Sequence, residues 1–492
     1  MSKFDPLKDM LAACEEESLT LSFDKIEKIM RRPLCNSAFI YAEYWSVADG
    51  HILPNTIKSA GYKITSVDLK NKRISLKKIR KTTEKPMKKI RMGVIGLGNR
   101  GHGVMNNVIL NLKDVEVTAV CDEYEDRCER AIGTVKEKSG KEPFSTTDYR
   151  ELLKSGLVDA VYVATSWEMH IKISIDAMRA GVAVAMEVGG AYDISECYDL
   201  VNTYEQTHTP IMLMENCCFD KNELLATSMV RKGKLGTVVH CAGAYAHDLR
   251  SEIAGGNVNR HYRLRNYLTR NCENYPTHEL GPIAKLLNIN RGNRMVSLVS
   301  VASKSAGMHD YLAAKEDADK TIADKNFAQG DIVTTIITCA GGETILLRLD
   351  TTLPRFYNRE FTVRGTKGLY EQGNNVFFLD GMPEAGVPDF YKENYSNADK
   401  YTDEFMPSIW KDITEEQKQT GHGGMDGFEF LAFTDALKNG KEMPIDVYDA
   451  AAWMCISALS ERSIAQGGAP QSIPDFTNGK WVIREPKDVV EL

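Results

Sequence analysis

Runs of apolar residues alternate with longer amphipathic stretches along residues 89–219. The apolar runs lie at 90–96, 115–122, 158–165, 182–188 and 210–216. The stretches between them, such as 99–112, have the spacing of helices. Apolar strands separated by helices predict a parallel sheet that is covered on both faces.

The pattern changes after Phe219. Short runs of alternating apolar and polar residues follow at 237–247, 295–303, 331–339, 343–351, 359–365 and 376–381. Several of them are joined by turn signals such as Gly341-Gly342. Consecutive strands without helices between them predict an open, mostly antiparallel sheet. We expect a helix over 447–465 to close the chain, and the polar stretches 304–330 and 380–420 to be loop insertions.

Residues 1–85 form a unit of their own. Residues 21–30 have helical spacing, with Ser22 placed as the N-cap, and alternating runs at 62–69 and 73–79 are typical of strands. The chain is therefore expected to be an α/β protein in three parts. These are a small α+β accessory domain at 1–85, a strand-and-helix domain at 88–218 and an α/β domain with the open sheet at 219–480.

Composition excludes several classes of protein. A net charge of −7 gives no reason to expect nucleic acid as the main partner. The chain has no apolar stretch of about 18 residues, which a membrane span requires, and acidic residues near the N-terminus do not suit a signal peptide. The eleven cysteines show no CxxC pattern, which favours reduced thiols, a cytoplasmic location and no metal site.

Ten Lys and Arg residues lie between Lys70 and Lys89. Two interpretations stay open for this basic run: a contact with nucleic acid or an acidic partner, and a solvated linker and strand edge. The second is the commoner use of such a run. The segment resembles a small bacterial domain of unknown function through its SA…Y…YW…H…AGYKI.SVDL pattern, and that resemblance implies no activity.

A glycine-rich turn follows the first apolar run. Residues 96–101 read Gly-Leu-Gly-Asn-Arg-Gly and fit the GxGxxG pattern between a predicted strand and a predicted helix. Gly96 allows the tight turn, Gly98 lets a pyrophosphate approach the backbone, and Gly101 lets helix and strand pack closely. The alternative is a structural glycine turn that binds no ligand. Asp122 ends the next strand, where a carboxylate binds ribose hydroxyls and favours NAD over NADP. We therefore expect residues 88–218 to be a NAD-binding Rossmann domain.

The segments DAVYVATSWEMH (159–170) and VAMEV (184–188) resemble the glucose–fructose oxidoreductase / inositol dehydrogenase (Gfo/Idh/MocA) family. That resemblance implies a Rossmann domain followed by an α/β domain with an open antiparallel sheet. Typical dehydrogenases of the family carry Glu-Lys-Pro after the fourth strand, and the lysine serves proton transfer. This chain has Glu187-Val188-Gly189 instead, so a sugar dehydrogenase would lack its usual proton-transfer group.

Further motifs follow in order. They are MENCC (214–218), AYAHDLR (244–250), HYRLR (261–265), YPTHELGP (275–282), NINRG (288–292), LPRFYNR (353–359), RGTKG (364–368), GHGGMD (421–426) and DVYDAAAW (446–453). Together they resemble glycoside hydrolase family 109, the NAD-dependent α-N-acetylgalactosaminidases, over about residues 89–480. The departures are the N-terminal domain, the absent export signal and Glu279, where a small residue such as Gly is expected.

The resemblance implies a glycosidase that needs no pair of flanking carboxylates. NAD⁺ takes a hydride from C3 of the sugar, a base removes the acidified C2 proton, the glycosidic oxygen leaves, water adds, and the hydride returns. His278 and Tyr275 are the expected acid/base pair, and which of them serves C2 stays open. We expect a helix to begin near Pro282. The alternative is that Tyr275 packs in the core and His278 caps that helix.

The same resemblance gives other residues their expected roles. A tyrosine ring covers sugar C–H faces while its hydroxyl bonds an oxygen, and Arg263 is expected at the cofactor or the sugar. His422 has no assigned role. The expected substrate-binding residues are Tyr245, Tyr275, Pro276, Thr277, His278 and Tyr357. The expected cofactor-binding residues are Gly96, Gly98, Asn99, Arg100, Gly101, Asp122, Trp167, His170, Glu187, Val188, Asn216, Arg263 and Tyr275.

Two other functions stay open. One is a sugar oxidoreductase with net turnover of NAD, against which the missing lysine and the YPTH and LPRFY motifs count. The other is a NAD- or sugar-sensing regulator that contacts DNA or a protein through residues 1–85. In each case we expect a small-molecule or glycan ligand and, by analogy with the family, a homo-oligomer that pairs through the open face of the second sheet.

Overall fold

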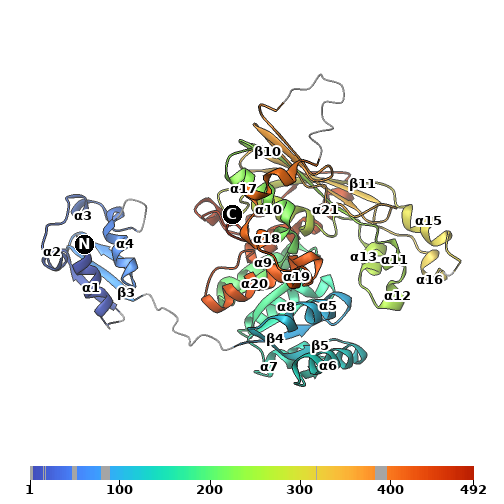
Figure 1. Cartoon of the computed structure of the whole chain (residues 1–492), viewed down its shortest axis with the longest axis horizontal. Coiled ribbons are helices and arrows are strands. Elements are labelled where there is room, and N and C mark those ends of the chain that lie inside the picture. Colours follow the sequence, from blue (N-terminus) through green and yellow to red (C-terminus); the bar gives the residue numbers. More distant parts are fainter. Residues whose placement is uncertain are drawn as a thin grey trace. The chain divides into compact units, whose positions relative to one another are not determined.

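The computed structural model describes residues 4–14, 16, 18–46, 52–78, 89–316, 318–382 and 396–492. The chain divides into two compact units, Met1–Met87 and Lys88–Leu492 (Figure 1). None of the helices in the described ranges is both long and apolar enough to cross a membrane. The boundary expected between residues 85 and 88, and residue 79 at the end of a predicted strand, lie outside the described residues.

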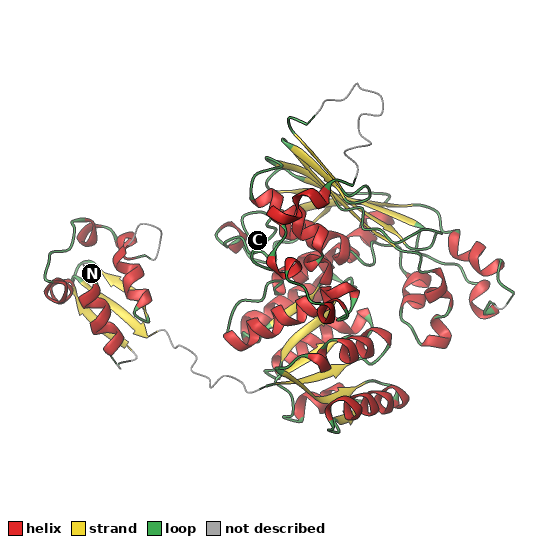
Figure 2. Cartoon of the chain, viewed as in Figure 1, coloured by secondary structure: helices red, strands yellow, loops and turns green. Residues whose placement is uncertain are grey.

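The N-terminal unit builds one core between its helices and a three-stranded antiparallel sheet of order β1-β3-β2 (Figure 2). Leu21 and Ser22 belong to a strand, so the predicted helix begins at Phe23, and Ser22 caps it by accepting a hydrogen bond from the Lys25 N–H. The elements are α1 (Asp5–Ala13), β1 (Ser18–Ser22), α2 (Phe23–Met30), α3 (Ser37–Ile40), η1 (Ala42–Trp45), α4 (Ile52–Ser59), β2 (Tyr62–Asp68) and β3 (Arg73–Lys78).

The second unit begins with a six-stranded parallel sheet of order β6-β5-β4-β7-β8-β9. All five predicted strands are present, and β6 was missed because it is only three residues long and has no buried side chain. The elements are β4 (Ile90–Ile95), α5 (Asn99–Asn107), η2 (Ile109–Asn111), β5 (Val115–Cys121), α6 (Glu125–Ser139), β6 (Phe144–Thr146), α7 (Tyr149–Lys154), β7 (Ala160–Val163), α8 (Trp167–Arg179), β8 (Ala183–Glu187), α9 (Ile194–Thr207) and β9 (Ile211–Met214).

An eight-stranded sheet of order β16-β15-β14-β10-β13-β12-β11-β17 follows. Every strand pair in it is antiparallel except β10 with β13. The predicted fold class, a Rossmann domain with an open, mostly antiparallel second sheet, is thereby confirmed. The strands are β10 (Val238–Ala246), β11 (Met295–Ala302), β12 (Ile332–Cys339), β13 (Thr344–Asp350), β14 (Thr362–Gly365), β15 (Gly368–Glu371), β16 (Val376–Leu379) and β17 (Gln471–Ser472).

The long helix α21 joins the two sheets, because it packs against β11 on one side and against α9 and β9 on the other. It does not close the chain, since the edge strand β17 follows it. The polar stretches hold short helices rather than loops alone, and residues 383–395 of the second stretch lie outside the described residues. The remaining elements are η3 (Asn216–Phe219), α10 (Lys221–Arg231), α11 (Arg250–Ala254), α12 (Gly256–Asn259), α13 (Arg263–Thr269), α14 (Thr277–Leu286), α15 (Gly307–Ala313), α16 (Lys320–Ala323), η5 (Ala398–Tyr401), α17 (Thr402–Phe405), α18 (Ser408–Lys411), α19 (Glu415–Lys418), η6 (His422–Gly424), α20 (Met425–Asn439), α21 (Val447–Ala465) and η7 (Lys480–Val482).

Candidate functional site

The glycine loop between β4 and α5 has the shape that a dinucleotide requires. A Cβ at Gly96 would lie 2.5 Å from the Ala164 carbonyl oxygen, and one at Gly101 would lie 1.8 Å from that of Gly96, so backbone packing demands glycine at both. Within the described chain, a Cβ at Gly98 would meet only the Arg127 guanidinium, at 3.7 Å. Space therefore lies open over Gly98, at the N-terminus of α5, where a pyrophosphate can approach.

Asp122 follows β5 and holds this loop. Its Oδ2 accepts a hydrogen bond from the Leu97 N–H at 2.6 Å, and its Oδ1 accepts one from the Tyr124 N–H at 3.1 Å. The Arg127 guanidinium lies 3.5 Å from the same carboxylate. The carboxylate therefore fixes the turn, and its remaining lone pairs are the acceptors that a ribose could use.

A charged cluster connects the glycine loop to the ends of β8 and β9. Arg100 donates to Glu187 at 2.7 Å and to Asp426 at 2.6 Å. Asn216 donates to the same Asp426 at 2.7 Å, and the His422 ring lies 2.9 Å from it. Burial opposes the ionisation of Asp426, but Arg100 and His422 outweigh this effect and lower the pKa of its carboxyl. Asp426, which the sequence did not single out, therefore joins GHGGMD to the expected cofactor residues.

Trp167 and His170 lie in the first turn of α8, beside these strand ends. Trp167 Nε1 and His170 Nδ1 are buried and have no hydrogen-bond partner in the described part of the chain. Buried polar atoms normally have a partner, so both atoms suit a group that binds here.

The position of the dehydrogenase lysine holds a buried apolar side chain, because Val188 is only 3 % exposed. A Cβ at the following residue, Gly189, would lie 2.6 Å from the Trp167 ring. Glu-Lys-Pro therefore does not fit this backbone, and the departure from the dehydrogenase pattern has a structural cause.

Helix α14 carries His278. It begins at Thr277, directly after Pro276, and not near Pro282 as expected, since Pro282 lies inside it. A proline inside a helix removes one hydrogen bond to the preceding turn. Nine of the ten residues of α14 are buried, and packing on this scale outweighs the missing bond.

Glu215 is the partner of His278, and the sequence did not identify it. His278 Nδ1 lies 2.8 and 3.0 Å from the two Glu215 oxygens. Burial opposes the ionisation of Glu215, but its interaction with His278 outweighs this effect and lowers the pKa of the carboxyl. An ionised carboxylate only accepts hydrogen bonds, so His278 Nδ1 carries a proton, and in the neutral form of the ring the lone pair then lies on Nε2. Glu215 follows strand β9, and an acid after a parallel strand is a signal that could have revealed it.

Aromatic rings surround His278. The Tyr275 ring lies 4.8 Å from the His278 ring, 4.6 Å from that of Tyr245 and 5.3 Å from that of Trp167. The Arg263 guanidinium lies 4.8 Å from the Trp167 ring and 5.0 Å from the Tyr275 ring. Burial raises the pKa of Tyr275 well above its ordinary value and that of Tyr245 to about 12, so both phenols keep their protons at neutral pH. Trp167 and Tyr275 thus bring the two expected sets of residues into contact.

Tyr357 lies at the outer edge of this cluster. Its ring lies 5.2 Å from the half-buried His247 ring, which in turn lies 5.9 Å from that of Tyr245. The Tyr357 hydroxyl accepts a hydrogen bond from Arg359 at 3.1 Å, while the residue is 46 % exposed. A ring that is fixed at one end and exposed elsewhere is suited to contact a sugar.

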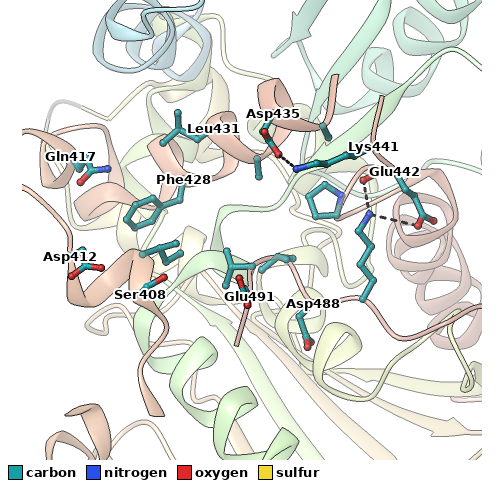
Figure 3. A pocket seen from close by; sticks show the side chains of 17 residues that line it. Ser408, Asp412, Gln417, Phe428, Leu431, Asp435, Lys441, Glu442, Asp488 and Glu491 are labelled. Carbon is teal, nitrogen blue, oxygen red and sulfur yellow. Dashed lines mark hydrogen bonds and ion pairs between the residues drawn. The ribbon is translucent and has the colours of Figure 1, made fainter. Parts of the chain in front are cut away.

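Two hollows open on the surface of the second unit. The smaller, of about 230 Å³, is lined by residues that include Asn99, Arg100, His422 and Asp426, and it therefore belongs to the cofactor region. The larger, of about 660 Å³, lies between α20 and residues 487–491 (Figure 3). None of the expected site residues lines the larger hollow, so it is separate from the candidate active site.

Three family models match the chain. Residues 219–483 match the C-terminal domain of glycosyl hydrolase 109, and residues 90–214 match the oxidoreductase family with the NAD-binding Rossmann fold. Residues 4–79 match a domain of unknown function, DUF7662.

Several relatives resemble most of the chain. An α-N-acetylgalactosaminidase of Tannerella forsythia is 36 % identical, over 81 % of this chain and 88 % of that protein. A glycosyl hydrolase family 109 protein of Stenotrophomonas maltophilia is 38 % identical, over 81 % of this chain and 91 % of that protein.

Among solved structures, myo-inositol 2-dehydrogenase from Lactobacillus plantarum matches with a TM-score of 0.57 and 17 % identity, over 79 % of this chain and all of that one. Scyllo-inositol dehydrogenase from Lactobacillus casei with bound NAD(H) and scyllo-inositol matches with a TM-score of 0.55 and 14 % identity, over 78 % of this chain and 99 % of that one. At this identity the likeness shows the shared fold.

Proposed function

Because this chain belongs to glycosyl hydrolase family 109, we propose that it hydrolyses the bond to a terminal α-linked N-acetylgalactosamine, or to a similar sugar, with NAD as its resident cofactor. The observation that carries the proposal is the Glu215–His278–Tyr275 arrangement, which lies beside the strand ends of the NAD-binding domain. Val188 occupies the lysine position of the related dehydrogenases, and this favours hydrolysis over net oxidation.

The chain's own residues handle the protons of the reaction. NAD, when bound, supplies reversible hydride acceptance at C3 of the sugar. His278 Nε2 takes the C2 proton, because Glu215 keeps the ring proton on Nδ1. The phenol of Tyr275, which keeps its own proton, hydrogen-bonds the C3 oxygen, while the proton of the C3 hydroxyl passes to solvent on oxidation and returns on re-reduction. We therefore propose His278 for the C2 proton and Tyr275 for the C3 oxygen, a choice that the sequence left open.

The remaining site residues divide between sugar and cofactor. Tyr245, Tyr357, Pro276 and Thr277 border the sugar, while Gly98, Asn99 and the α5 N-terminus face the pyrophosphate. Asp122 faces a ribose. The residues at the nicotinamide end are Arg100, Trp167, His170, Glu187, Val188, Asn216 and Arg263.

An aryl α-N-acetylgalactosaminide tests this function. The purified protein, with no cofactor added, should release the phenol over many turnovers without net formation of NADH. NADH that accumulates in proportion to added NAD⁺ would contradict the proposal and support the sugar oxidoreductase. His278→Gln should lose turnover while the denatured protein still releases NAD, which separates a chemical defect from loss of the cofactor. The matching α-N-acetylglucosaminide tests the choice of sugar.

Two further observations support proposals about the compartment and the oligomeric state of the protein. All eleven cysteines are free, and nine of them are buried, which suits a reducing compartment such as the cytoplasm. Val301 and Ile336 are exposed apolar side chains on the neighbouring strands β11 and β12, which supports a homo-oligomer that pairs through this sheet.

A further inference from the structure

The N-terminal unit has a recognisable order of elements. Helix α1 leads into β1, the helix α2 follows, the short elements α3 and η1 connect it to α4, and the hairpin β2–β3 comes directly after α4. The first strand pairs with the last, so the antiparallel sheet has the order β1-β3-β2. This order of strands and main helices resembles that of winged helix-turn-helix domains, in which a recognition helix enters a DNA groove and the hairpin lies near the phosphate backbone.

Helix α4 has the two faces that such a role requires. Leu53, Pro54 and Ile57 are buried in the core of the unit. Lys58 and Ser59 are exposed, and Thr56 is half-buried. The outer face of α4 therefore carries a cation and hydroxyl groups, which bind phosphates and base edges.

The hairpin is basic and largely unneutralised. Lys63, Lys70, Lys72 and Lys77 are exposed on it, whereas its carboxylate, Asp68, pairs with Arg73. Among the described residues, no ion pair involves Lys63, Lys70 or Lys77. Exposed lysines without an ion pair on this hairpin give the charge pattern that phosphate contacts require.

Charge divides sharply between the two units. Residues 1–87 contain sixteen Lys and Arg against eleven Asp and Glu, although the whole chain carries −7. The overall charge therefore conceals a basic N-terminal unit attached to a strongly acidic catalytic unit. Such asymmetry is typical of chains in which one part contacts a polyanion.

We propose that the N-terminal unit binds double-stranded DNA, with α4 in a groove and the β2–β3 hairpin on the phosphate backbone. The topology favours duplex DNA over an acidic protein, because an acidic partner would need the charge but not this order of helices and strands. The binding site lies entirely within residues 4–78 and is independent of the glycosidase function.

Fluorescence anisotropy of the full-length protein with a labelled duplex of about 25 base pairs tests the proposal. We expect binding that weakens steeply with salt, with a Kd of about 10⁻⁴–10⁻⁶ M near physiological salt for a non-cognate sequence. Lys70→Glu/Lys72→Glu should weaken binding tenfold or more and leave hydrolysis unchanged. The matched control Lys113→Glu/Lys154→Glu exchanges exposed lysines of the catalytic unit and should bind DNA as the parent does.

Three results would overturn the proposal. The first is that the protein does not bind the duplex at low salt. The second is that the two double variants lose DNA binding equally. The third is that the protein binds single-stranded RNA, or an acidic polypeptide such as polyglutamate, more tightly than the duplex. Circular dichroism of each variant establishes that the N-terminal unit remains folded.

Discussion

Glu215 and His278 lie 63 positions apart in the sequence and 2.8 Å apart in the structure. The motif YPTH pointed to His278 and Tyr275, because a family resemblance preserves local patterns. Glu215 was missed, since its partner is brought to it only when β9 and α14 meet. The same reason hid Asp426, which lies 326 positions from Arg100. Sequence motifs therefore predicted the groups that we propose to act on ligands, and the structure added the groups that hold these side chains in place.

Glu215→Gln tests whether Glu215 positions His278. The neutral amide no longer holds the proton on Nδ1, so we expect kcat/KM to fall by about 10²–10⁴. The acidic limb of the pH–rate profile should also move, which a merely structural role would not cause. Glu416→Gln, an exposed control on α19, should leave both unchanged. A Glu215→Gln enzyme within threefold of the parent would contradict the positioning role.

Substitutions at two glycines of the cofactor loop should have different effects, one on NAD binding and the other on the stability of the fold. At Gly98 an added methyl group would meet only the Arg127 guanidinium, at 3.7 Å, so Gly98→Ala should keep Tm within about 2 °C and weaken NAD binding tenfold or more, because the methyl group would occupy the proposed pyrophosphate position. At Gly101 the methyl group collides with the Gly96 carbonyl, so Gly101→Ala should lower Tm strongly. Thermal scans and NAD titration measure both effects. Unimpaired NAD binding by Gly98→Ala would place the pyrophosphate elsewhere.

Among the helices and strands, the sequence predicted those in which apolar residues form a long or regular pattern. The five apolar strands of the parallel sheet are largely buried, so their composition revealed them. The short helices α15 and α19 did not stand out, because each has too few turns to display a periodic face. The early start of α14 was missed because the proline rule describes an isolated helix, whereas packing against neighbours decides here.

Helix α14 also carries Glu279, the acid that departs from the expected small residue. Glu279 and Glu273 are both buried, and their oxygens have no donor in the described part of the chain. Burial raises the pKa of both carboxyls, that of Glu273 to about 8 and that of Glu279 well above its ordinary value. In the unfolded chain both ionise near pH 4.3. The folded state therefore holds more protons between about pH 5 and pH 8.

Ionisation of these two carboxyls favours the unfolded chain. The free energy of unfolding should therefore fall as the pH rises from about 5 to 8. Glu279→Gln removes one titrating group and should flatten the decline in Tm over this range by roughly 2 °C or more. Differential scanning calorimetry at several pH values measures it, with Glu416→Gln as the control. If the Tm of Glu279→Gln falls with pH as steeply as that of the parent, the buried pair of carboxyls does not govern the pH dependence of stability.

At the scale of the whole molecule, the parts carry separate tasks. All the candidate catalytic residues belong to the unit Lys88–Leu492, while the unit Met1–Met87, for which we propose DNA binding, precedes it in the sequence. The overall charge of −7 describes neither unit, because an average over the chain combines a basic N-terminal unit with an acidic second unit. The net charge of a whole chain is informative about its solubility, but it does not show how charge is distributed over the surface of each unit.

Exposed apolar side chains on the outer face of the eight-stranded sheet lead us to predict that two copies of the chain pair through this face. Val301 is 53 % and Ile336 is 51 % exposed on neighbouring strands. If this face pairs two copies, light scattering coupled to size-exclusion chromatography should give a dimer or larger species. Val301→Glu/Ile336→Glu should shift it to the monomer, because charges would be buried in the interface. A monomeric parent protein would contradict this assembly.

The most direct measurement concerns the hydrogen at C2 of the sugar. Hydrolysis of an aryl α-N-acetylgalactosaminide in deuterated water, followed by mass spectrometry and NMR of the released sugar, reports whether the C2 proton leaves. Removal of that proton by His278, with NAD lending and recovering the C3 hydride, predicts one solvent deuterium at C2 in the product. Complete hydrolysis with protium retained at C2 would contradict the mechanism.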